Sequence, residues 1–177
     1  MSTQFSTAYL LVDGYNIIHA WKKLKAMAEV SLISAREMLV DILANYRGYK
    51  HQEIIVVFDA HRVEGGTGAV EKRNGVYIVY TREAETADEY IEKTTGQLRR
   101  ERIRVRVATS DHLEQIIIMG QGAARLFAED LQREVNEVER IIRDRINKPK
   151  PIKKNMLYEN LDPETAAAIE KMRMESM

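Results

Sequence analysis

The chain has 177 residues, and its 27 Lys plus Arg balance 27 Asp plus Glu, so the formal net charge is zero. This length predicts one domain with room for an appendage, and it buries enough surface to fold without disulfides or a structural metal. The absence of cysteine excludes cysteine-ligated zinc and is typical of a protein of the reducing cytoplasm. We expect no signal peptide and no membrane partner. No basic region precedes an apolar core at the N-terminus, and no apolar run reaches roughly 20 residues.

Charge is unevenly distributed along this neutral chain. Five arginines lie between positions 99 and 106, four lysines lie between 148 and 154, and acids crowd 83–92 and 129–139. Such asymmetry permits a local phosphate-binding surface on a protein without net charge. Solvated helix faces and a basic tail explain either basic cluster equally well when it is considered alone.

Short apolar runs bounded by turn residues predict strands at 9–12, 54–58, 76–80 and 104–108. The second run is apolar throughout, which is typical of a strand covered on both faces of a parallel sheet. In the fourth run arginines alternate with apolar residues, so one of its faces is expected to reach solvent or a ligand.

Helices are predicted between and after these strands, at 15–27, from Ser31 or Ser34 to Gly48, from a Thr86–Glu89 capping box to about 100, at 113–119, and at 123–146. Strands that alternate with helices predict a three-layer α/β/α domain with a mainly parallel central sheet. We expect this domain to span 8–147.

The composition changes after residue 147. The stretch 148–154 is basic and holds two of the three prolines, which predicts a linker or an arm. Asp162 followed by Pro163 predicts the start of a last short helix. The segment 148–177 is therefore expected to be a basic linker with a short C-terminal helix.

Four aspartates share a position relative to the predicted strands. Asp13 and Asp59 directly follow the first and second strands. Asp88 and Asp111 lie at helix N-termini just beyond the third and fourth. In a parallel sheet all four meet at the edge formed by the carboxyl ends of the strands, where α/β proteins bind ligands. Clustered carboxylates repel one another, so an oxygen-only set of this kind predicts Mg²⁺ or Mn²⁺.

A metal site of this type favours hydrolysis of a phosphodiester, because the cation can activate water and stabilise the leaving oxygen. Each acid also has a purely structural explanation. Asp13 can be a turn residue, and Asp88 and Asp111 suit the positive end of a helix dipole. An aspartyl phosphatase of the haloacid dehalogenase type is a further alternative for Asp13. That chemistry uses a second Asp two positions on, where this chain has Tyr15.

Four motifs follow one another in order: Leu11-Val12-Asp13-Gly14-Tyr15-Asn16, Val57-Phe58-Asp59-Ala60, Thr86-Ala87-Asp88 with Tyr90-Ile91, and Ala108-Thr109-Ser110-Asp111 with Gln115. Together they resemble the YacP branch of the NYN-domain proteins, which belongs to the PIN-like ribonuclease superfamily. The resemblance covers about 10–146 and extends to a bacterial ribosome-associated endonuclease that cleaves messenger RNA in the ribosomal A site.

The resemblance implies a PIN-like fold and a metal-dependent endoribonuclease that acts on mRNA, with the ribosome as a partner. It implies that Asp13, Asp88 and Asp111 hold Mg²⁺ or Mn²⁺. Asp59 would orient the other acids, and Asn16 would be a supporting polar group. The resemblance says nothing of oligomeric state.

Several basic or polar side chains are candidates for RNA phosphate because they lie in predicted loops or strand ends: Arg62, Lys72, Arg73, Arg82 and Ser110. Ser110 can equally cap the helix that follows it. The basic clusters at 99–106 and 148–154 are candidates for contact with ribosomal RNA. The competing hypothesis is a non-catalytic RNA- or ribosome-binding module that keeps the same fold.

Overall fold

The structure, a computed structural model, describes residues 8–59, 68–111, 119–120, 122–147, 163–165, 167 and 171. It divides into two compact units, Met1–Ile142 and Arg143–Met177, and each is considered by itself. The first unit holds the sheet and the helices that cover it. In the second, the residues described at 163–165, 167 and 171 are helical and lie in the segment where a C-terminal helix was predicted. The predicted domain boundary after 147 stays a prediction.

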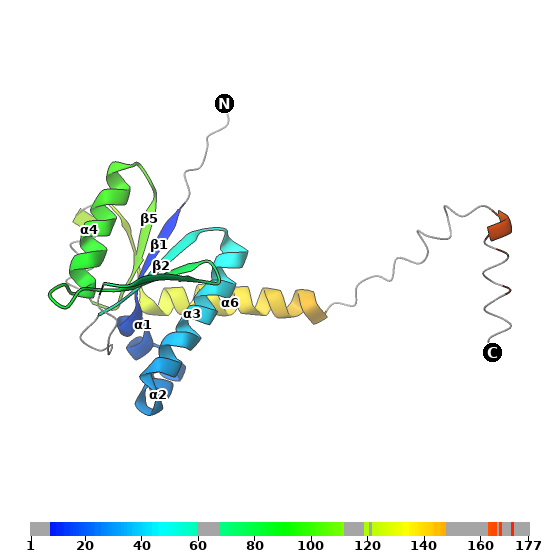
Figure 1. The fold of residues 1–177 in the computed structure, drawn as a ribbon, viewed down its shortest axis with the longest axis horizontal. Coiled ribbons are helices and arrows are strands. Elements are labelled where there is room, and N and C mark those ends of the chain that lie inside the picture. Colours follow the sequence, from blue (N-terminus) through cyan, green and yellow to red (C-terminus); the bar gives the residue numbers. More distant parts are fainter. Residues whose placement is uncertain are drawn as a thin grey trace. The chain divides into compact units, whose positions relative to one another are not determined.

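The described residues form one six-stranded sheet in the order β3-β4-β2-β1-β5-β6 (Figure 1). The strands are β1 (Tyr9–Asp13), β2 (Glu53–Phe58), β3 (Val70–Arg73), β4 (Val76–Tyr80), β5 (Val105–Ala108) and β6 (Ala124–Leu126). Every neighbouring pair is parallel except β3 and β4, which are antiparallel. The predicted mixed α/β fold with a mainly parallel sheet is confirmed.

Helices cover both faces of the sheet. They are α1 (Gly14–Ala20), α2 (Lys22–Val30), α3 (Leu32–Lys50), α4 (Ala87–Arg100) and α6 (Ala128–Asn147). Buried residues of α1, α2, α3 and α6 share one apolar core, whereas α4 contributes to a second core on the opposite face. Three layers result, as predicted.

The central strand β1 is apolar on both sides because it faces both cores. Leu10 and Val12 belong to the core beneath α1, α2, α3 and α6, and Leu11 belongs to the core beneath α4. All three side chains are fully buried. Since β1 lies between β2 and β5, its last residue, Asp13, stands near the middle of the sheet's carboxyl edge.

The first predicted helices differ from the prediction in their boundaries. The helix predicted over 15–27 is interrupted at Trp21, which has extended backbone and whose indole Nε1 donates to the carbonyl of Ala128 at 2.8 Å. This tertiary contact outweighs the local helical pattern. The next helix begins after the cap residue Ser31 but passes through Gly48 and stops at His51, which has left-handed backbone.

The strands β3 and β6 were not predicted. β3 forms a hairpin with the predicted strand β4 around Asn74 and Gly75, both with positive φ, which is the Asn-Gly turn typical of two-residue hairpin loops. β6 pairs with β5 over residues that were predicted to be helical, so the long helix starts at Ala128 instead of 123. The helix predicted at 113–119 lies largely outside the described residues.

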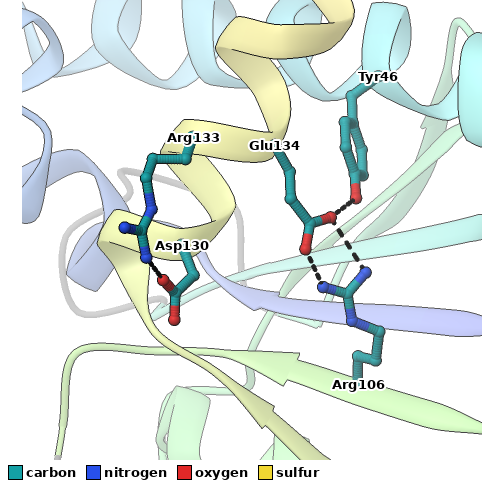
Figure 2. A network of polar contacts seen from close by, with 5 residues as sticks. All are labelled: Tyr46, Arg106, Asp130, Arg133 and Glu134. Carbon is teal, nitrogen blue, oxygen red and sulfur yellow. Dashed lines mark hydrogen bonds and ion pairs between the residues drawn. The ribbon is translucent and has the colours of Figure 1, made fainter.

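A polar network fastens α6 to the layers beside it. The Glu134 carboxylate of α6 accepts hydrogen bonds from the Tyr46 hydroxyl of α3 and from both terminal nitrogens of Arg106 on β5. Figure 2 shows the three side chains converging from three different elements. Arg106 therefore has a structural partner inside the fold, although it belongs to the basic cluster that was considered for RNA.

We expect Glu134→Gln to lower stability at neutral pH and to flatten its acid dependence. Burial raises the pKa of Glu134, but hydrogen bonds from Arg106 and Tyr46 outweigh it and hold the pKa below its ordinary 4.5. A lowered native pKa gives stability that is present above pH ~4.5 and lost as the pH falls through the native value. Urea unfolding should show a loss of about 1–3 kcal/mol at pH 7.

Glu137→Gln is the matched control, because Glu137 lies on the same helix in an exposed pair with Arg140. Solvent screens such pairs, so this variant should unfold close to the wild type at neutral pH. Equal acid sensitivity of Glu134→Gln and the wild type would contradict the role given to the network.

Candidate active site

Asp13 is a carboxylate held almost out of water. It is the last residue of β1 and the N-cap of α1, and only 4% of its surface is exposed. Its Oδ1 accepts the backbone N–H of Asn16 at 3.1 Å. The apolar strand therefore drives this acid into the interior, and the start of α1 supplies the hydrogen bond that makes its burial tolerable.

Asn16 orients Asp13 from the first turn of α1. Its side-chain Nδ2 donates to Asp13 Oδ2 at 2.6 Å, while its Oδ1 accepts the Ser110 hydroxyl at 2.8 Å. Ser110 lies beyond β5, so this chain of bonds joins the ends of β1 and β5. The supporting position predicted for Asn16 thus has a geometric basis, and the Ser110 hydroxyl is used in this bond.

The other three predicted acids lie around the same edge. Asp59 directly follows β2 and is half-buried, and Asp88 is an exposed residue in the first turn of α4. The Thr86–Glu89 capping box that begins α4 is present as predicted and holds Asp88 at that helix end. Asp111 follows β5, and its backbone N–H donates to the buried Thr109 hydroxyl at 3.1 Å.

A cleft of about 280 Å³ opens at this edge and is lined by Asp13, Tyr15, Asn16, His19, Asp59, Thr86, Ala87 and Asp88. Three of the four predicted acids line it together with Asn16. Tyr15, His19 and Thr86 were not predicted as site residues. Spacing offered a signal for two of them, since Tyr15 and His19 are four residues apart and share one side of a helix.

The carboxylates are close enough to perturb one another. Asp88 is an exposed residue overall, but partial desolvation of its carboxyl, followed by the charges of Asp13, Asp111 and Asp59, raises its pKa. Burial is also the main cause of the raised pKa of Asp13, which the hydrogen bonds from Asn16 oppose and the charge of Asp59 reinforces. Mutual repulsion of this kind is what a bound cation relieves.

The donor chemistry of the cleft fits a divalent cation, although no closed cage is formed. Among the described residues, no group of three or more His, Asp or Glu side chains is arranged to hold a metal ion. Mg²⁺ is commonly held by only one or two carboxylates and keeps several waters. A partly buried carboxylate set with an amide beside it suits such a hydrated ion better than zinc, which prefers nitrogen and sulfur.

The family model of the YacP-like NYN domain matches residues 10–174. The chain belongs to the YacP-like NYN family. Membership supports a nuclease-type, RNA-related function. In the part of the chain that is described, no helix is both long and apolar enough to span a bilayer.

Relatives of this YacP-like domain come from Bacillus subtilis. The protein YacP of strain 168, described as uncharacterized, is 46% identical over 142 residues, which is 78% of this chain and 81% of that protein. A crystal structure of Rae1 (YacP) has a TM-score of 0.71 at 39% identity and covers 96% of this chain and 92% of its own. A crystal structure of a mutant of the same protein gives 0.69 at 36% identity, covering 94% and 99%.

The predicted RNA-binding cations of this YacP-like domain are placed at different distances from the carboxyl edge. Arg82 follows β4 and is exposed at that edge. Lys72 and Arg73 lie at the end of β3, and Arg73 pairs with Val76 at the amino end of β4. Lys72 donates to the Tyr77 hydroxyl at 3.0 Å. Arg62 lies outside the described residues.

We expect Asp88→Asn to stabilise the metal-free domain slightly at pH 7. A raised native pKa gives stability that is present below the ordinary value of 3.8 and lost as the pH rises through the native value. Ionised Asp88 is therefore a net cost at neutral pH. Because Asp88 is exposed and screened, the gain should be below about 1 kcal/mol, and it should vanish near pH ~3.5. Urea unfolding in EDTA at both pH values measures it.

Asp41→Asn makes the same chemical change at an exposed acid of α3 that does not line the cleft. We expect no comparable pH-dependent gain from this control. A lower unfolding midpoint of Asp88→Asn at pH 7 would mean that the favourable helix-end position of Asp88 outweighs the repulsion.

Gly14 is required where β1 turns into α1. A Cβ built on Gly14 would lie 2.2 Å from Cε1 of the buried Phe58 ring, so Gly14→Ala must displace that ring. We expect a loss of about 1–3 kcal/mol in denaturant unfolding. Gly48→Ala is the control, because nothing lies within 4 Å of its Cβ position in α3. It should gain about 0.5–1 kcal/mol through helix propensity. Equal effects of the two variants would rule out the close approach of Phe58.

Proposed function

We propose that this protein is a Mg²⁺- or Mn²⁺-dependent endoribonuclease that cleaves cytoplasmic mRNA in association with the translating ribosome. The observation that carries the proposal is the meeting of carboxylates at one edge of the sheet. Asp13, Asp59 and Asp88 come from three separate parts of the chain, yet all three line one small cleft. The YacP-like NYN family, with its nuclease-type function, supplies the supporting context.

Asp13, Asp88 and Asp111 are the proposed cation-holding groups. A divalent cation held there would polarise the scissile phosphate and favour loss of a proton from the attacking water. Asn16 keeps Asp13 in one orientation through its two bonds to the carboxylate, at 3.1 and 2.6 Å. Asp59 adds negative charge beside Asp13 and would orient waters or the other acids.

RNA reaches such a site only if cations offset the acids. Arg82 lies at the correct edge, and Ser110 presents a hydroxyl beside Asn16. We retain Arg62, Lys72 and Arg73 as further candidates for RNA phosphate. Association with the ribosome would use the exposed arginines at the end of α4 and the basic stretch 148–154, which lies outside the described residues. These contacts should be sensitive to salt.

A non-catalytic RNA- or ribosome-binding module is the second candidate. One observation favours it, namely that the described acids form no group of three arranged to hold a metal. Titration of Mn²⁺ by calorimetry separates the candidates. Binding that Asp88→Asn weakens supports the nuclease, whereas no binding by the wild type supports the module.

Cleavage of RNA, free and on translating ribosomes, tests the proposed function directly. We expect activity that requires Mg²⁺ or Mn²⁺ and stops on addition of EDTA. Asp13→Asn and Asp88→Asn should each lower the cleavage rate by at least about 100-fold, because each removes charge that acts on the reacting phosphate. Asp41→Asn, outside the cleft, should cleave like the wild type. Full activity in both cleft variants would refute the assignment.

A further inference from the structure

A second, smaller pocket lies on the α3 side of the sheet. It measures about 110 Å³ and is lined mainly by Arg36, Glu37, Phe58, Arg73, Ile78 and Tyr80. Its residues come from α3, β2, β3 and β4. None of the residues that line the acidic cleft lines this pocket.

An aromatic wall separates the pocket from the acidic cleft. Tyr15 lines the cleft and meets the Phe58 ring edge-on, with 5.2 Å between ring centroids. Phe58 in turn stacks on Tyr80 at 5.9 Å, and both rings line the pocket. The two hollows are therefore linked through the contact of Tyr15, which lines the cleft, with Phe58, which lines the pocket.

Arg36 is one of the two arginines that line this pocket. Its Nη1 donates to the Tyr15 hydroxyl at 3.0 Å, and its guanidinium lies 6.0 Å from the centroid of the Tyr80 ring. No ion pair is formed between Arg36 and any carboxylate of the described residues. A half-buried guanidinium that is oriented by two tyrosines and has donors to spare is suited to an external anion.

Arg73 adds a second positive charge that is only loosely neutralised. Its nearest carboxylates are Glu37 at 3.9 Å and Glu71 at 3.7 Å, and 42% of its side chain is exposed. Pairs at these distances and exposures contribute little, so Arg73 can exchange them for a stronger partner. Glu37, on the rim, opposes an incoming anion.

We propose that the pocket formed by Arg36 and Arg73 binds a backbone phosphate of the RNA strand, next to the phosphate that enters the acidic cleft. This inference rests on the proposed nuclease function. An RNA strand drawn across an edge rich in carboxylates needs positive charge beside it, and Arg36 supplies it one side chain away from Tyr15 of the cleft. A guanidinium fork matches phosphate oxygens in geometry as well as in charge.

The pocket is large enough for a phosphate group of the RNA but too small for a nucleotide base with its sugar. Pockets that enclose whole small molecules measure roughly 300–1,000 Å³. At about 110 Å³ this one admits a phosphate group but not a nucleoside. The contact carries no sequence information, so it would fix the position of the strand and not the choice of codon.

Binding of a short single-stranded RNA in EDTA, which prevents metal-dependent cleavage, gives the first test. We expect Arg36→Gln to weaken binding about 10-fold and to reduce the slope of log K against log salt by about 0.7. Glu37→Gln should tighten binding by about two- to three-fold because it removes an opposing charge. Lys50→Gln, at the other end of the same helix and about 21 Å away, should leave binding unchanged.

A neutral methylphosphonate placed at successive positions of the substrate gives the second test and does not depend on the folding of a variant. The substrate is whichever RNA the wild type cleaves, free or ribosome-bound. At one position beside the cleaved bond, we expect the substitution to raise the wild-type KM several-fold with kcat unchanged. Arg36→Gln should be insensitive to the substitution at that same position, because the partner of the phosphate is already gone.

The outcomes separate this inference from the function on which it rests. If the wild type binds and cleaves RNA but Arg36→Gln, folded by circular dichroism, matches it in affinity and salt slope, the phosphate pocket is refuted and the nuclease stands. The phosphate pocket would also be refuted if Arg36→Gln and the methylphosphonate each raised KM by the same factor whether or not the other change was present. A wild type that neither binds nor cleaves RNA in any form overturns both.

Discussion

The burial of one negative charge governs the architecture of this site. Asp13 stands at the end of the central strand, between β2 and β5, with 4% of its surface exposed. A carboxylate in that position needs hydrogen-bond donors, and Asn16 supplies two of them, from its backbone N–H and its side-chain amide. Ser110 then holds Asn16, so the ends of β1 and β5 and the start of α1 form one polar unit. The raised pKa of Asp13 indicates that these bonds do not fully offset its burial.

The parallel topology brings further negative charges to the edge where Asp13 is buried. Each strand that runs beside β1 ends at the same edge and delivers another acid there, so the placement of one carboxylate makes the others costly. The pKa of Asp88 records this cost, since burial and three neighbouring aspartates raise it. A domain selected for stability alone would neutralise this edge. Retaining the charges carries a local cost in stability, and such a cost is common at functional sites.

The sequence was sufficient to predict the strands that face two cores and the positions of the acids that follow them along the chain. Apolar runs and cap residues such as Ser31 and Thr86 are local signals, and the structure agrees with them. Trp21 was not predictable in this way, because its indole bonds to Ala128, which lies 107 positions later in the chain. The exposed strand β3 has no apolar alternation, although Asn74-Gly75 was a hairpin signal that could have found it. His19 also lines the cleft. Its spacing from Tyr15 puts both residues on one side of a helix, but that side can be assigned to the cleft only when the position of α1 is known.

Gly14 and Tyr15 connect the acidic cleft to the rest of the domain. Phe58 can pack against the backbone of Gly14 because no Cβ is present there, and this brings the ring edge-on to Tyr15. Tyr15 then presents its hydroxyl to Arg36 on the far side of the ring pair. The short turn after β1 thus places an acid on one side of an aromatic wall and fixes a guanidinium on the other. The formal net charge of the chain is zero, so this local separation of negative and positive charge does not show in the overall composition.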